Sequence, residues 1–335
     1  MISTILIENY RAIRKLNIEG LKQVNIIVGP NNSGKSSFLE AIYLASAFVD
    51  PEDKIFPVSL EIPGRGRNKL IYLLSRRGEA PFSASVESIW KSEMKRILWF
   101  NYDTSNPIKI ALKINNVVVQ VNISAEKLYP AGVLEIKKPQ SEFLSKVTFI
   151  DNSTLRMLKH LEDKLWFNIL LSDLDKDIIS LLKGGYNVDA EYVTFMPVMG
   201  QYRLIVKLKK GAVRVNDLGD GARYAILLAM VLSSLKDTAL LLEEPETHQH
   251  PAGLAETLKI MYMLAKMRNI QIFITTHSIE LVRIASRIAE EKEIPLAIYF
   301  FERKMDGEID VRKVTPEDKD ILEKLGIDIR FLHLF

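Results

Sequence analysis

The chain has 335 residues, a length that corresponds to about two structural units. Hydrophobic residues make up 47% and charged residues 26%, a mixture typical of a globular protein with a sizeable core, which excludes disorder as the main organisation. The absence of cysteine excludes disulfides, thiolate metal sites and cysteine nucleophiles. The formal net charge of +3 is too close to balance to indicate nucleic-acid binding by itself.

The first residues are not typical of a signal peptide, because Glu8, Arg11 and Arg14 interrupt any apolar core. No run of about 18 uncharged apolar residues occurs, so we expect no membrane insertion. We therefore predict a cytoplasmic protein.

Short strands rich in Ile, Leu and Val are predicted at 2–8, 16–19 and 23–28, followed by a loop and a helix over 38–49. Prolines then punctuate the chain, and two alternating stretches flank the turn Asn115-Asn116, which is typical of a β-hairpin. We predict an inserted β-rich lobe over 51–146. The prolines exclude a long coiled-coil arm there.

The remainder predicts a buried strand at 147–151, a helical lobe at about 155–183, and strands alternating with helices after residue 210. Helices are expected over 252–267 and 278–290. The predicted fold is therefore α/β, with a mostly parallel sheet, helices on both of its faces and an antiparallel β portion at the N-terminus. The main domain would comprise 1–50 and 147–335.

Residues 29–36, Gly-Pro-Asn-Asn-Ser-Gly-Lys-Ser, match the phosphate-loop pattern G-x4-GK[ST] between a strand and a helix. Inward-pointing N–H groups and the helix N-terminus hold a triphosphate in such loops. Lys35 is expected to reach the β- and γ-phosphates of ATP, and Ser36 to coordinate Mg²⁺. The nucleotide-binding residues expected in this loop are Asn31, Asn32, Ser33, Gly34, Lys35, Ser36 and Ser37.

A second motif is the apolar strand 239–242, which ends in the acids Glu243 and Glu244. Acids at this place in a nucleotide-hydrolysing site hold the magnesium ion and polarise the attacking water. We predict Glu243 as the metal-side acid and Glu244 as the general base. A strand that merely ends in solvated acids is the alternative.

Two further motifs complete the pattern. His277 follows the strand 270–274 and is predicted to contact the γ-phosphate, although a histidine satisfied by packing is the alternative. Residues 216–223 form a glycine-rich turn that opens a helix, as a clamp on another subunit's nucleotide requires, and a plain helix cap is the alternative. The residues expected to bind nucleotide here are Leu218, Gly219, Asp220 and Gly221.

In their order and spacing these four motifs resemble the Walker A, signature, Walker B and switch-histidine motifs of the ABC-type ATPase head. The opening, residues 5–44, is similar to the RecF/SMC-like branch. Within that branch, EEPETHQHP (243–251) and LGIDIRFL (325–332) resemble ATPases related to the overcoming-lysogenisation-defect (OLD) family. The resemblance covers about 1–50 and 147–335. It implies an ATP-dependent homodimer with two ATPs between the subunits, and implies that Arg11 touches the nucleotide.

The chain departs from the family pattern at four points, one of which is His250 at the usual position of the D-loop acid. Gly219 replaces the usual signature serine, and Glu243 stands where aspartate is commonest. The usual Q-loop glutamine has no clear counterpart, because Gln140 comes too early, and Asn152 is a candidate substitute. These departures predict slow hydrolysis.

Several functions fit these motifs. We favour an ATP-switched ATPase that acts on nucleic acid or on a separate effector protein, in DNA repair or phage defence. A transporter nucleotide-binding subunit is disfavoured by the degenerate signature. An OLD-type nuclease is disfavoured because few residues follow His277, and because Asp306, Glu308 and Asp310 surround an expected hairpin turn.

Nucleic acid would need basic surface, and two clusters of basic residues are candidates. Either cluster could instead be an ordinary solvated face. The first comprises Arg65, Arg67, Lys69, Arg76 and Arg77, and the second Lys207, Lys209, Lys210 and Arg214.

Overall fold

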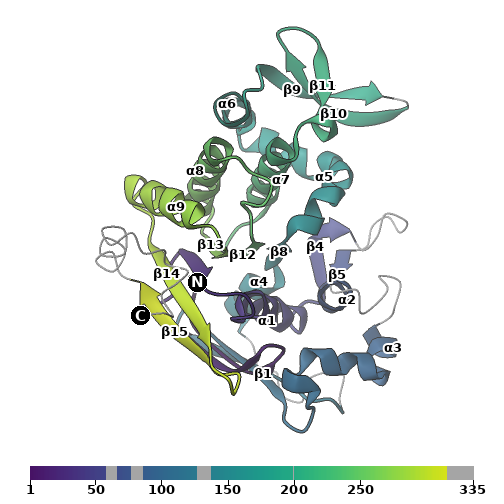
Figure 1. Cartoon of the computed structure of the whole chain (residues 1–335). Helices are drawn as coiled ribbons and strands as arrows, with labels where there is room; N and C mark the ends of the chain where they lie inside the picture. Colours follow the sequence, from purple (N-terminus) through teal and green to yellow (C-terminus); the bar gives the residue numbers. More distant parts are fainter. Residues whose placement is uncertain (58–65, 77–85, 127–136, 199, 315–335) are drawn as a thin grey trace.

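The computed structural model describes residues 1–57, 66–76, 86–126, 137–198 and 200–314 (Figure 1). Arg65 and Arg77 of the first basic cluster, and the segment 325–332, lie outside the described residues. Two sheets face each other across a buried helix, and a layer of helices covers the far side of the larger sheet (Figure 1).

The larger sheet has six strands in the order β15-β14-β3-β13-β12-β8. All neighbours in it are parallel except the antiparallel pair β14–β15. The central strands are buried on both faces, which explains their continuous apolar sequences. The strands are β3 (Val24–Val28), β8 (Thr148–Ile150), β12 (Thr238–Glu243), β13 (Ile270–Thr275), β14 (Leu296–Arg303) and β15 (Ile309–Val314). The predicted mostly parallel sheet is confirmed.

The second sheet is antiparallel, with four strands in the order β2-β1-β6-β7. They are β1 (Ile2–Tyr10), β2 (Ile13–Glu19), β6 (Ile108–Ile114) and β7 (Val117–Ile123). The hairpin predicted around Asn115-Asn116 is present, and both residues adopt the positive φ that its turn requires.

This hairpin falls within the inserted β-rich lobe predicted over 51–146, and it joins the N-terminal sheet. Strand β6 pairs with β1 along its length, from Ile2 opposite Ile114 to Glu8 opposite Lys109. The alternating apolar residues of β6 and β7 therefore complete the core beneath the N-terminal sheet rather than a core of their own.

The rest of 51–146 is less β-rich than predicted. Its other described elements are β4 (Glu52–Pro57), β5 (Gly66–Asn68), α2 (Lys69–Ser75), α3 (Val86–Lys91), α4 (Lys138–Ser145) and two 3-10 segments, Glu93–Leu98 and Phe100–Tyr102. Helix α2 packs beside α1, so this segment lies close to the phosphate loop.

Helix α1 (Lys35–Ala47) is the buried helix between the two sheets. It is apolar on nearly all sides, as a helix enclosed by the core must be. It begins three residues before the predicted start, because Gly34 serves as its N-cap. This places Lys35 and Ser36 in its first turn.

The helical layer packs on the other face of the parallel sheet and forms a second core with it. Its helices are α5 (Leu158–Leu171), α6 (Asp175–Tyr186), α7 (Asp220–Ser234), α8 (Pro251–Met267) and α9 (Ile279–Glu291). A small sheet, β9 (Ala190–Val198), β10 (Gln201–Leu208) and β11 (Ala212–Arg214), projects beyond them at the top of Figure 1. No helix in the described ranges is both long and apolar enough for a bilayer crossing.

Candidate nucleotide site

The phosphate loop connects β3 to α1 at the carboxyl end of the parallel sheet. Gly29 has φ 150°, and a Cβ there would lie 2.3 Å from the backbone oxygen of Phe301, so only glycine fits. Gly34 has φ 90° and ends the loop. These two glycines let the chain turn sharply from the end of a buried strand into a buried helix.

Lys35 lies folded over this loop. Its ammonium donates to the backbone oxygens of Gly29 at 2.9 Å and of Pro30 at 2.8 Å, and the residue is only 5% exposed. Burial lowers the pKa of Lys35 to about 8, although Glu244 and Glu243 oppose that effect. A triphosphate supplies stronger acceptors than these carbonyls, so a bound nucleotide could draw the ammonium away from them.

A cavity of about 340 Å³ opens over the loop. All seven loop residues expected to bind nucleotide line it. It is lined by Ala12, Asn31, Asn32, Ser33, Gly34, Lys35, Ser36, Ser37 and His277.

The register of the parallel sheet brings the predicted acids to this loop. Glu243 lies opposite Thr275, and Thr275 lies opposite Ile27, so β12, β13 and β3 end at the same edge. Ser36, in the first turn of α1, lies close enough to the Glu243 carboxylate to influence its pKa. Burial raises the pKa of Glu243, while Arg76 and Ser36 oppose the rise. A serine hydroxyl beside a carboxylate is an oxygen pair that fits Mg²⁺.

Glu244 and His277 also meet at this edge. Glu244 adopts a positive φ of 47°, and its N–H donates to the backbone oxygen of Thr275 at 2.9 Å. Its Oε1 lies 3.5 Å from Nε2 of His277. Both side chains are partly exposed, so a water molecule has access to the carboxylate.

Sequence reasoning missed the role of Glu246. This buried carboxylate accepts hydrogen bonds from the Thr276 hydroxyl and from the His277 N–H, the latter at 3.3 Å. Burial raises its pKa, against the effect of these hydrogen bonds. Glu246 therefore fixes the loop that carries His277. The sequence did contain a signal for this role, because Glu246 is the third acid of the segment EEPETHQHP (243–251).

Arg76, at the end of α2, was also missed. It donates to Glu40 at 2.6 Å and Asp151 at 3.0 Å, and it forms a third ion pair with Glu243. Its guanidinium also lies over the ring of Phe149, 4.7 Å from the ring centroid. Glu243, the predicted metal-side acid, is thus held by an arginine of the inserted segment.

The first basic cluster is consequently not a nucleic-acid surface where it is described. Besides Arg76, Arg67 is buried against Asp53 at 3.1 Å, and the buried Lys69 donates to the backbone oxygen of Ser145 at 2.9 Å. Their charged groups are therefore bonded to partners inside the protein. The second cluster is largely exposed, although Lys209 and Arg214 pair with Asp189 and Asp217.

Arg11 does not line the cavity over the loop, but it lines an adjoining cavity of about 230 Å³, so the nucleotide contact that the resemblance implies stays a prediction. Its guanidinium forms an ion pair with the buried Glu40 and donates to the backbone oxygen of Leu73 at 2.8 Å. The adjacent Ala12 lines the cavity over the loop. Arg11 thus acts as a buried anchor for α1 and α2.

The predicted signature residues lie elsewhere, at the N-terminus of α7. Gly219 is the N-cap and Asp220 the first helical residue, and both are exposed. A Cβ on Gly219 would meet open space. None of the four residues from Leu218 to Gly221 lines the cavity over the loop of the same chain.

Two other predicted positions are placed as follows. Asn152, the candidate Q-loop substitute, lies two residues after the end of β8 and donates to the hydroxyl of Thr247 at 3.3 Å. Gln140 is buried and donates to the backbone oxygen of Ile114 at 3.4 Å, so its role is structural.

A phosphate loop on a mostly parallel sheet, with paired acids and a histidine at the same edge, defines a P-loop ATPase of the ABC type. The chain belongs to the family described as "AAA domain, putative AbiEii toxin, Type IV TA system", which matches residues 24–283.

Individual relatives agree with this assignment. The chain is 21% identical to an "ATP/GTP phosphatase" of Helicobacter pylori, over 92% of this chain and 94% of the relative. It is 30% identical to the DNA replication and repair protein RecF of Acetivibrio thermocellus, over 51% of this chain and 42% of RecF.

A solved SMC head, bound to the C-winged helix domain of ScpA, superposes with a TM-score of 0.60 at 14% identity. The superposition covers 95% of this chain and 99% of the SMC head chain. The predicted relationship to SMC heads and RecF is confirmed, and at this identity the likeness to the SMC head establishes the fold alone.

Proposed function

We propose that this protein binds ATP with Mg²⁺ and hydrolyses the nucleotide slowly. The observation that carries the proposal is the meeting of two pairs at the mouth of one loop, Ser36 with Glu243 and Glu244 with His277. The first pair would hold the metal, which supplies charge neutralisation at the phosphates. The second would orient and deprotonate a water molecule.

Within this site the roles divide by position. Lys35 would leave the loop carbonyls for the β- and γ-phosphates, since charged oxygens are better acceptors than amide oxygens. Glu244 would take the proton of the attacking water, and His277 would contact the γ-phosphate. Glu246 would keep the His277 loop in place through its two hydrogen bonds.

We further propose that ATP joins two copies of the chain. The exposed helix N-terminus at Gly219 and Asp220 lies outside the cavity of its own chain and is free to face the γ-phosphate held by a second copy. Because Gly219 has no side-chain hydroxyl, only backbone N–H groups would make that contact, which favours slow turnover.

The dimer would switch a further partner, either a separate effector protein or nucleic acid, in DNA repair or phage defence. Arg67 and Arg76 of the first basic cluster form ion pairs inside the protein, which makes nucleic acid a weaker candidate for this partner. The second cluster, around Lys207 to Arg214, remains available for it. The finer resemblance to OLD-related ATPases stays a prediction.

The test is Glu244→Gln, with Glu290→Gln on the exposed face of α9 as the control. We expect Glu244→Gln to bind ATP normally, to release phosphate about 100-fold more slowly or worse, and to accumulate as an ATP-dependent dimer in light scattering. Glu290→Gln should match the parent protein. Hydrolysis by Glu244→Gln at the parental rate would show that another residue is the base.

A further inference from the structure

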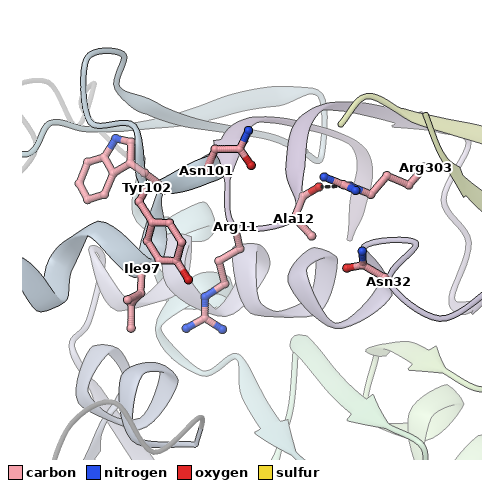
Figure 2. Close-up of a pocket in the computed structure, with 8 residues that line it drawn as sticks. Arg11, Ala12, Asn32, Ile97, Asn101, Tyr102 and Arg303 are labelled. Atoms are coloured by element: carbon pink, nitrogen blue, oxygen red, sulfur yellow. Dashed lines mark hydrogen bonds between the residues drawn. The ribbon is translucent and has the colours of Figure 1, made fainter. Parts of the chain in front are cut away.

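A second cavity, of about 230 Å³, adjoins the one over the phosphate loop. The two cavities share Ala12 and Asn32 as lining residues. In Figure 2, Tyr102 and Ile97 lie on one side of the turn at Arg11 and Ala12, and Asn32 and Arg303 lie on the other. A molecule with its phosphates on the loop could therefore extend into this second space.

The outer wall of this cavity comes from residues 97–102 and is firmly attached to the head. Tyr10 and Trp99 form a β-bridge, and the N–H of Arg11 donates to the backbone oxygen of Leu98 at 2.9 Å. The Trp99 ring is buried and its indole N–H donates to the backbone oxygen of Asn106 at 2.9 Å. The opposite wall is held by Arg303, whose Nε donates to the backbone oxygen of Ala12 at 3.0 Å.

Two residues of this wall adopt a conformation that side chains normally avoid. Asn101 has φ 51° and Tyr102 has φ 59°, both in the left-handed region. The Tyr102 side chain is nevertheless 64% exposed, and within the described ranges the Asn101 amide has no hydrogen bond. The strained backbone at these two residues thus places the exposed ring of Tyr102 and the amide of Asn101 at the mouth of the cavity.

We propose that this cavity receives the base of the nucleotide whose phosphates lie on the loop. The ring of Tyr102 would stack on the base, and the amides of Asn101 and Asn32 would face its polar edge. An aromatic face suits any base, and an amide offers both a donor and an acceptor. This inference rests on the proposed nucleotide binding and assigns a specificity role to the inserted segment.

The test compares ATP with inorganic tripolyphosphate, which has the anionic tail but no base. We expect Tyr102→Ala to weaken ATP binding by about 10-fold or more, the range that stacking on an aromatic ring accounts for, and to leave tripolyphosphate binding unchanged. Tyr102→Phe should bind ATP as the parent does. The matched control is Tyr202→Ala, on β10, whose side chain is 66% exposed and lines neither of the two cavities.

The outcomes separate this inference from the function on which it rests. Unchanged ATP affinity in Tyr102→Ala, or equal affinity of the parent protein for ATP and tripolyphosphate, would overturn the base site while leaving the phosphate loop intact. If the parent protein bound neither compound, the proposed function itself would fall. Unfolding midpoints of both alanine variants should equal that of the parent, because each ring is largely exposed.

Discussion

At the residue scale, Arg76 carries much of the buried charge beside the phosphate loop. It pairs with Glu40, Asp151 and Glu243, and Glu40 pairs in turn with Arg11. Taking charges out of water is costly, and such a network is tolerated only while every member keeps its partner. The network therefore links the stability of the head to the position of the acid that we assign to the metal.

We predict that Arg76→Ala lowers the free energy of unfolding by about 3–5 kcal/mol, because it leaves three carboxylates without their shared cation. Urea denaturation would measure the loss. The control is Arg312→Ala, which breaks an exposed pair with Glu302 and should cost below about 1 kcal/mol. Equal, small losses in the two variants would show that the Arg76 network contributes little.

The sequence revealed the phosphate loop because all its residues are contiguous. The sequence could not reveal the environment of Arg76. A basic residue in a proline-rich segment gives the same pattern whether its side chain is solvated or paired with buried acids. Arg67, Lys69 and Arg76 could be counted as a candidate nucleic-acid surface because of that ambiguity. Tyr102 was missed for a similar reason, because its place beside Ala12 depends on distant contacts.

At the scale of elements, the hairpin β6–β7 is the part of the inserted segment that extends the N-terminal sheet. Leu112 and Ile110 of β6 are fully buried in the core that also holds α1. Alternation in the sequence predicted the hairpin correctly. It could not indicate which strand edge the hairpin joins, because pairing between β1 and β6 is set by tertiary packing.

We therefore predict that Leu112→Ala destabilises the whole head, by about 2–5 kcal/mol, as expected for truncation of a fully buried leucine. The matched control is Val118→Ala on β7, whose side chain is 55% exposed and whose loss should cost below about 1 kcal/mol. Thermal unfolding should remain a single transition. A separate early transition in Leu112→Ala, with the rest of the protein unaffected, would indicate an independent lobe.

At the scale of the whole molecule, the two groups of residues that we assign to the nucleotide site lie at different places on the chain. The loop, the acids and His277 gather at the carboxyl edge of the parallel sheet, whereas the exposed turn at Gly219 opens α7 in the helical layer. On the proposed function, a single chain binds nucleotide, and turnover depends on a second copy. Activity per chain should then rise with protein concentration.

The central claim is that the loop at residues 29–37 binds the phosphates of ATP, and calorimetric titration with ATP and Mg²⁺ tests it most directly. We predict saturable binding by the parent protein and by the control Lys22→Ala, whose lysine is exposed and distant from the cavity lining. Lys35→Ala should weaken that binding by about 100-fold or more, because it removes the ammonium that we propose to move from the loop carbonyls to the phosphates. Parental affinity in Lys35→Ala would contradict the account.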